Sequence, residues 1–148
     1  MIKRLLLAIV ALFVAWSILD ILIHGLILAS TYQATASLWR PMNEMKMGLM
    51  KTLTLVVAIA FAGIYAALID RKSVSAGAKF GLLFGIATGF SMGFGTYCVM
   101  PIPMRLAAGW AAGTLVETVI GGLIVGAIIR RPGTESAFQP HNQQMVAG

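Results

Sequence analysis

The chain has 148 residues, of which 59% are hydrophobic and only 11% are charged, whereas an average soluble domain carries roughly 25% charged residues. So few charged side chains cannot cover the surface of a water-soluble fold of this length, so we expect a protein that lies in the lipid bilayer. The formal net charge of +6 does not indicate nucleic-acid binding, because the basic residues stand at the ends of apolar runs, where lipid head groups would meet them. A single cysteine, Cys98, excludes an internal disulfide.

The first predicted element is a membrane-spanning helix over about residues 5–29, preceded by Lys3 and Arg4. A signal peptide is the competing interpretation, because a basic start is followed by the small-x-small sequence of Ala34–Ala36, which has the form of a cleavage site. The apolar run is longer than the core of a typical signal peptide and suits a spanning helix of about 20 residues. We therefore predict an anchor that stays attached.

Three further apolar runs follow a polar and aromatic connection at residues 30–49, whose later part, Met42–Met50, is predicted to form a short helix at the membrane surface. These further spans are predicted over about 49–69, 80–100 and 106–129. Ser73–Lys79 is predicted as a short turn. The chain is therefore expected to be all-α, with a polytopic four-helix transmembrane domain over residues 1–131. Residues 132–148, rich in Pro, Gln, Asn, Ser and Gly, are predicted to form a disordered cytoplasmic tail.

The distribution of basic residues predicts the orientation of the four spans. Four spans place both termini and the 70–79 connection on one side, whose basic residues are Lys3, Arg4, Arg71, Lys72, Lys79, Arg130 and Arg131. The opposite side carries fewer, namely Arg40, Lys46, Lys51 and Arg105. Because cytoplasmic segments carry the excess of Lys and Arg, we predict a multi-pass protein of a bacterial inner membrane with both termini in the cytoplasm.

Glycine recurs at every fourth position along the third and fourth predicted spans. The members of this series are Gly77, Gly81, Gly85, Gly89, Gly93, Gly109, Gly113 and Gly121. Residues four apart share one face of a helix, so each span presents a smooth face of the glycine-zipper type. Small faces let helices pack closely in lipid. We expect a tight hairpin between the third and fourth spans, although another copy or another protein is an equally open partner.

Three ionisable residues lie within predicted spans: Asp20, His24 and Glu117. Asp20 and His24 are four apart and share one helix face, and Glu117 lies at a comparable depth, in the slot that breaks the glycine rhythm of the last span. Ionisable groups in hydrocarbon are costly and indicate function by default. If the first and fourth spans are neighbours, the three side chains meet. They would then form a proton or ion path, a metal site, or a hydrogen-bonded cluster that only fixes the register of the helices.

Metal binding is a further open alternative. One imidazole, from His24, and two carboxylates, from Asp20 and Glu117, resemble the ligand set of a divalent transition metal. The methionines Met42, Met45 and Met47 offer soft thioether sulfur that suits Cu(I). Methionine is also a flexible filler of apolar interfaces, so packing explains the same residues.

The chain resembles the small four-span inner-membrane proteins of bacteria. The residues that carry this resemblance are Trp16–Gly25 in the first span, Leu38–Pro41 after it, and the glycine-rich segment 109–126. The resemblance implies a multi-pass inner-membrane protein and implies no activity.

The function expected from these observations is non-enzymatic. No nucleophile–base pair or metal motif is specific enough to name, and no cofactor is expected. The leading hypothesis is a structural or accessory subunit that packs through its glycine-rich helix faces, with the lipid bilayer, further copies of itself or other membrane subunits as partners. The alternative is a proton- or cation-coupled transporter or channel, a homo-oligomer, that uses Asp20, His24 and Glu117.

Overall fold

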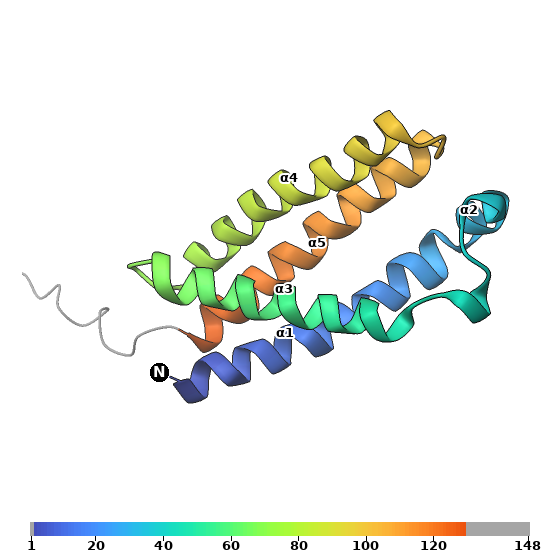
Figure 1. Ribbon diagram of the computed structural model, residues 1–148. Helices are drawn as coiled ribbons and strands as arrows, with labels where there is room; N and C mark the ends of the chain where they lie inside the picture. The colour runs from blue at the N-terminus through green and yellow to red at the C-terminus, as the bar shows by residue number, and fades with distance from the viewer. Residues whose placement is uncertain (1, 130–148) are drawn as a thin grey trace, which may run out of the picture.

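The computed structural model describes residues 2–129, and all regular structure in this part of the chain is helical (Figure 1). The long helices are α1 (Ile2–Leu22), α3 (Met47–Leu68), α4 (Val74–Val99) and α5 (Met104–Ile128). A π-helical turn, Ile23–Ile27, extends α1, so that four helices are long and apolar enough to cross a membrane. The prediction of an all-helical protein with four candidate membrane spans is confirmed.

The connections differ from the sequence-based expectation in two places. Ser73 accepts a hydrogen bond from the backbone N–H of Ala76 (3.1 Å), and this N-cap starts α4 at Val74, so the turn predicted over Ser73–Lys79 is wrong. The surface helix predicted over Met42–Met50 is also wrong, because a single 3₁₀ turn precedes the start of α3. The short helix α2 (Ala29–Ala34) and two 3₁₀ turns, Ala36–Leu38 and Met42–Glu44, form this connection. The predicted tail, 132–148, lies outside the described residues.

The helices run back and forth between two ends of the molecule (Figure 1). One end, here called the terminal end, carries the start of α1, the α3–α4 connection and the end of α5. The other, the α2 end, carries α2 and the α4–α5 connection. Helix α4 lies along α5 over its whole length, and α1 packs against both α3 and α5. Helices α1 and α5 therefore each pack along two other long helices.

Five of the six glycines of α4 face α5. Its buried residues are Gly77, Gly81, Gly85, Gly89 and Gly93. A Cβ atom added at Gly81 would collide with the backbone carbonyl of Thr118, and one at Gly77 with that of Gly122. The backbones of the two helices therefore touch, which is possible only where side chains are missing.

The predicted glycines of α5 lie on a different face. A Cβ added at Gly121 would lie 2.9 Å from the Trp16 ring, one at Gly113 3.0 Å from Ile23, and one at Gly109 2.6 Å from Leu28. These three positions thus receive large side chains from α1 and the segment that follows it. The part of α5 that touches α4 contains other small residues, with two larger ones among them: Ala107, Ala111, Thr114, Leu115, Thr118, Val119, Gly122 and Gly126.

Two apolar clusters fill the space between the helices. The cluster at the terminal end joins α1, α3 and α5 around Leu12, Trp16 and Phe61, with the Trp16 and Phe61 ring centroids 5.3 Å apart. Phe61 also contacts Phe80 of α4, at 4.6 Å between centroids. The cluster at the α2 end contains Ile23, Leu28, Ile102, Leu106 and Ala107, with partly buried aromatic rings against it. Between these clusters lies the polar group described next.

Candidate functional site

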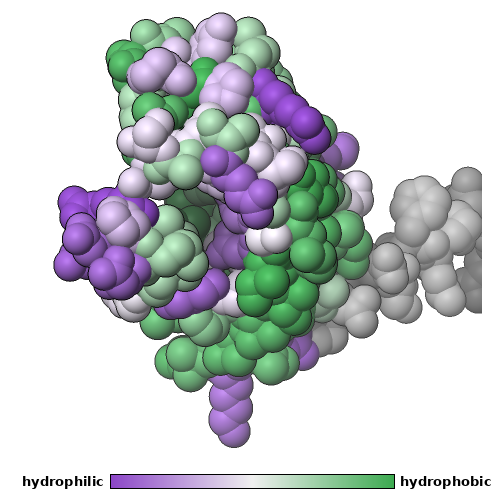
Figure 2. Space-filling model, turned by 90° about the vertical axis from the view of Figure 1, so that its right-hand side faces the viewer, coloured by the Kyte–Doolittle hydropathy of each residue, from purple (hydrophilic) through white to green (hydrophobic). Residues whose placement is uncertain are grey.

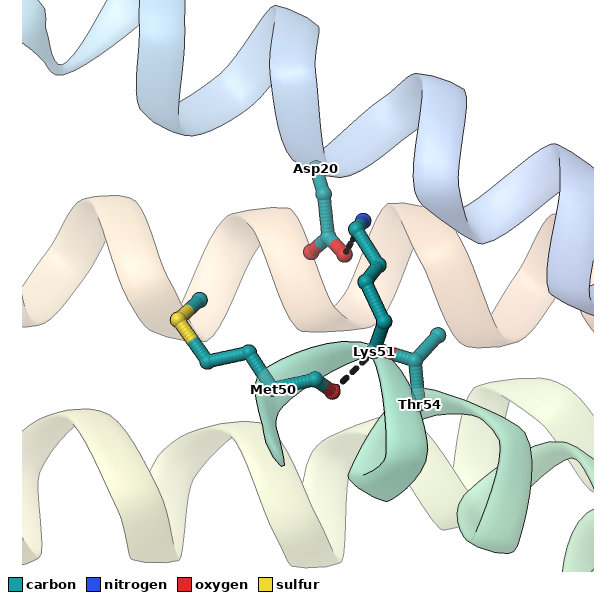
Figure 3. A network of polar contacts seen from close by, with 4 residues as sticks. All are labelled: Asp20, Met50, Lys51 and Thr54. Atoms are coloured by element: carbon teal, nitrogen blue, oxygen red, sulfur yellow. Dashed lines mark hydrogen bonds and ion pairs between the residues drawn. The ribbon is translucent and has the colours of Figure 1, made fainter. Parts of the chain in front are cut away.

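Three ionisable side chains from three different helices meet between the apolar clusters. Asp20 points from α1 and Lys51 from α3, and the Lys51 Nζ atom lies 3.6 Å from Asp20 Oδ2 (Figure 3). Glu117 of α5 lies beside Asp20, close enough for the two carboxyl groups to share a hydrogen bond. Asp20 and Glu117 are called the carboxyl pair below. The ion pair is partly accessible, since the Lys51 and Asp20 side chains are 41% and 32% exposed.

The surrounding fold fixes the position of Glu117 on α5. The neighbours on its own face, Gly113 and Gly121, admit side chains of α1, so that the two helices approach closely at this level. Trp16 donates a hydrogen bond from its indole N–H to the Glu117 backbone carbonyl (2.7 Å), which fixes the relative register of α1 and α5. The Glu117 carboxyl group is thereby held against α1 and the neighbouring Asp20.

One oxygen atom of the carboxyl pair and one hydroxyl group near the pair lack hydrogen-bond partners. The Oε1 atom of Glu117 and the hydroxyl oxygen of Ser17, one turn before Asp20, are both buried, and neither has a hydrogen-bond partner among the described residues. A hydrogen bond between two carboxyl groups requires a proton on one of them, because an ionised carboxylate only accepts. Lys51 supplies one positive charge against two acidic groups. The arrangement can therefore bind one further positive charge, either a proton or a small cation.

His24 connects this pair to the α2 end. It lies in the π-helical turn, one helical turn beyond Asp20, with which it interacts electrostatically. Its Nδ1 atom is 2.7 Å from the Tyr32 hydroxyl of α2. Trp110 of α5 donates its indole N–H to the same hydroxyl at 2.6 Å. Of the three residues singled out from the sequence, Asp20 and Glu117 lie beside one another, and His24 interacts with Asp20 electrostatically.

Tyr32 is held as a neutral phenol. Burial raises the pKa of its hydroxyl above the ordinary value, and the hydrogen bond from Trp110 lowers this pKa by a smaller amount. A group whose pKa is raised on folding stabilises the fold below its unfolded pKa, about 10 for tyrosine, and loses this contribution as the pH rises through the folded value.

An alkaline titration tests this assignment of Tyr32. Raising the pH above about 10 should lower the thermal stability of the wild-type protein more steeply than that of Tyr32→Phe, because only the wild type must keep this phenol protonated to stay folded. Thermal unfolding in detergent at neutral and alkaline pH measures both slopes. Equal slopes for the two proteins would show that Tyr32 does not titrate with unfolding.

Sequence reasoning missed three members of the site: Lys51, Tyr32 and Trp110. Lys51 was assigned to the basic residues of the membrane surface, although it stands inside the predicted 49–69 span. A lysine inside a span was the available signal, since ionisable residues there seek a partner. Tyr32 and Trp110 carry no signal of their own, because aromatic residues are common at membrane surfaces.

The metal hypotheses gain no support from the geometry. Within residues 2–129, no three side chains of His, Cys, Asp or Glu gather closely enough to hold a metal ion. Of the candidate methionines, Met42 and Met47 are 78% and 49% exposed in or beside the connection that leads to α3.

The α2 end of the molecule is hollowed, and hydrophilic side chains are visible inside the hollow (Figure 2). Nearby, the α2–α3 connection lines a groove of about 370 Å³ whose charged members are Arg40 and Lys46. At the terminal end, the cluster around Leu12, Trp16 and Phe61 closes the interior. The carboxyl pair therefore lies nearer to polar surroundings on the α2 side. Comparison with known protein families, with curated proteins and with solved structures found no match for this chain.

Proposed function

We propose that this protein is a non-enzymatic, multi-pass inner-membrane protein that takes up and releases a proton or a small cation at the carboxyl pair, as one step of coupled transport. The observation that supports it best is the buried, unpartnered Oε1 atom of Glu117 beside Asp20. A carboxyl group that served only to hold helices together would be expected to have its hydrogen bonds satisfied within the fold. An exchangeable proton or cation needs such a free oxygen atom to bind.

The charges around the pair favour exchange of a single positive charge. With Lys51 bound to Asp20, an ionised Glu117 leaves one uncompensated negative charge in the membrane interior, which is costly. One proton or one monovalent cation removes that cost. The polar members of the site extend toward the α2 end, whereas apolar side chains close the terminal half. Passage across the whole membrane then needs a helix movement or a second copy, so the proposal includes a homo-oligomer.

The proposed orientation places the α2 end outside the cytoplasm. Lys3, Arg4, Arg71, Lys72 and Lys79 gather at the terminal end, which the positive-inside rule assigns to the cytoplasm. The exchanged ion would accordingly enter from the outer side, and neither nucleic acid nor a cofactor takes part.

An accessory-subunit role is the second candidate, and it is favoured by the outer face of α4. With its glycines turned toward α5 in a glycine-zipper hairpin, α4 exposes large apolar side chains on its other faces, including Leu82, Leu83, Ile86 and Phe90. In a membrane these faces contact lipid or a helix of another subunit. Native mass spectrometry of gently extracted protein separates the two candidates: a second polypeptide supports the accessory role, and a homo-oligomer supports transport.

Glu117→Gln tests the transport proposal directly. Infrared difference spectra between acidic and alkaline pH should show the C=O stretching band of a buried protonated carboxyl group in the wild type. That band should vanish in Glu117→Gln, because the amide keeps the size and hydrogen bonding of the side chain but cannot titrate. Glu44→Gln, in the connection before α3, is the matched control and should keep the band. A band that persists in Glu117→Gln, or is missing from the wild type, would contradict the proposal.

A further inference from the structure

The two hydrogen bonds of the Tyr32 hydroxyl, at the α2 end, have a preferred assignment of donors and acceptors. The indole N–H of Trp110 can only donate, so the Tyr32 oxygen accepts from it at 2.6 Å. The second contact of this hydroxyl is the Nδ1 atom of His24, at 2.7 Å. If the Tyr32 O–H donates to Nδ1, both contacts of this hydroxyl are satisfied, one as an acceptor and one as a donor.

The opposite arrangement leaves a hydroxyl proton without a partner. If Nδ1 carried the hydrogen, the Tyr32 oxygen would accept two bonds, and no other described residue accepts the Tyr32 proton. Such a group is partly buried, and leaving its proton without an acceptor is unfavourable. The contacts therefore favour neutral His24 with its hydrogen on Nε2 and with Nδ1 as the acceptor.

This tautomer places His24 between two regions of the site. The Tyr32 hydroxyl of α2 contacts Nδ1 of the ring, and Asp20, one helical turn back along α1, interacts with the ring electrostatically. The remaining charged groups near this position are Lys51 of α3 and Glu117 of α5, both joined to it through Asp20. His24 thus stands between the α2 end, to which it is hydrogen-bonded, and the carboxyl pair, with which it interacts electrostatically.

The geometry points to His24 as the proton-transfer residue of the carboxyl pair, with Tyr32 and Trp110 as positioning residues that fix its ring nitrogens; this inference rests on the proposed function. In uptake, a proton from water at the α2 end binds the Tyr32 oxygen while the Tyr32 hydroxyl proton moves to Nδ1. The imidazolium then passes its Nε2 proton to Asp20 through a bridging water molecule, and the pair shares that proton with Glu117. Release follows the same bonds in reverse, so the original tautomer is restored without rotation of the ring.

A purely structural role for these residues predicts a different outcome. If the Tyr32–His24 bond only anchored α2, replacing His24 would alter stability but not the rate at which the carboxyl pair equilibrates with solvent. The rate of proton exchange therefore distinguishes transfer from anchoring, provided that the same variants are compared at equal folded content.

The experiment uses the full chain in lipid nanodiscs and follows the Glu117 carboxyl band by time-resolved infrared spectroscopy after a rapid pH change. His24→Gln should slow the appearance of the protonated band at least about tenfold, since a positioned acid–base group contributes 10²–10⁴-fold in proton transfer. His141→Gln, which removes the other histidine of the chain, should match the wild type. Tyr32→Phe should also slow the appearance of the band. Tyr65→Phe, which removes a phenol hydrogen-bonded to Ser73, should not change its rate.

Nitrogen NMR of His24 supplies a measurement that does not depend on transport. The wild type should show the Nε2–H tautomer, and Tyr32→Phe should shift the population toward Nδ1–H. If the carboxyl band appears as fast in His24→Gln as in the wild type, the relay is overturned and the proposed function still stands. A wild-type carboxyl group that does not respond to pH would overturn both. A wild-type Nδ1–H tautomer would overturn the positioning role of Tyr32.

Discussion

Replacing Gly81 with Ala should destabilise the protein by about 1–3 kcal/mol, the range of overpacking in a well-packed interior. The added Cβ would collide with the backbone carbonyl of Thr118 on α5. A backbone atom cannot rotate away as a side chain does, so α4 and α5 must separate along their whole contact. Because these helices lie together over their full length, the loss spreads beyond the substituted position. Reversible unfolding by increasing SDS in mixed micelles measures the change in free energy.

Two other glycines provide matched controls for Gly81→Ala. Gly95, on the same helix, has no atom within 4 Å of an added Cβ, so Gly95→Ala should be neutral or stabilising. At Gly109 an added Cβ meets only the end of the Leu28 side chain, which can move, so Gly109→Ala should cost less than Gly81→Ala. Equal effects at the three positions would show that helix propensity, and not contact between backbones, decides the outcome.

Replacing Lys51 with Met should destabilise the protein by about 1–2 kcal/mol, between the values for exposed and for buried ion pairs. The Lys51 and Asp20 side chains are 41% and 32% exposed, so neither limit applies to this pair. Without Lys51, two acidic groups remain beside one another in the membrane interior. Asp20→Asn should cost less, because the long Lys51 side chain can extend to the head groups when its partner is neutral.

The double variant Asp20→Asn/Lys51→Met completes a thermodynamic cycle for this ion pair. It should be more stable than Lys51→Met alone, since no unpaired charge is left on α1. Lys79→Met, an exposed lysine in the first turns of α4, is the control for loss of a positive charge and should leave the unfolding free energy unchanged. Strict additivity of the two substitutions would contradict an interaction between Asp20 and Lys51.

Residue spacing predicts one part of the candidate site and not the rest. Asp20 and His24 share a helix face because they are four residues apart, and this follows from helix geometry alone. That Glu117 joins them depends on α5 being the neighbour of α1, which no pattern in either helix specifies. Lys51 resembled a surface residue for the same reason: its partner, Asp20, belongs to another helix.

The glycine pattern illustrates the same limit within a single helix. A period of four along α4 marks one small face, and that face lies against α5. Along α5 small residues occur on two faces, so their spacing does not show which helix packs against which face. Gly109, Gly113 and Gly121 receive side chains of α1 and its extension, whereas Gly122 and Gly126 meet the backbone of α4.

The amino-acid sequence by itself determined four helices that are long and apolar enough to cross a membrane, since hydrocarbon requires long apolar segments that satisfy their own backbone hydrogen bonds. Only the tertiary structure decided which helices are neighbours, and with that the meeting of Asp20, Lys51 and Glu117 and the contact of His24 with Tyr32. The physical reason is that lipid tails are as apolar as the helices they surround. Lateral order therefore depends on local packing and a few polar contacts between helices, and these are properties of pairs that no single helix contains.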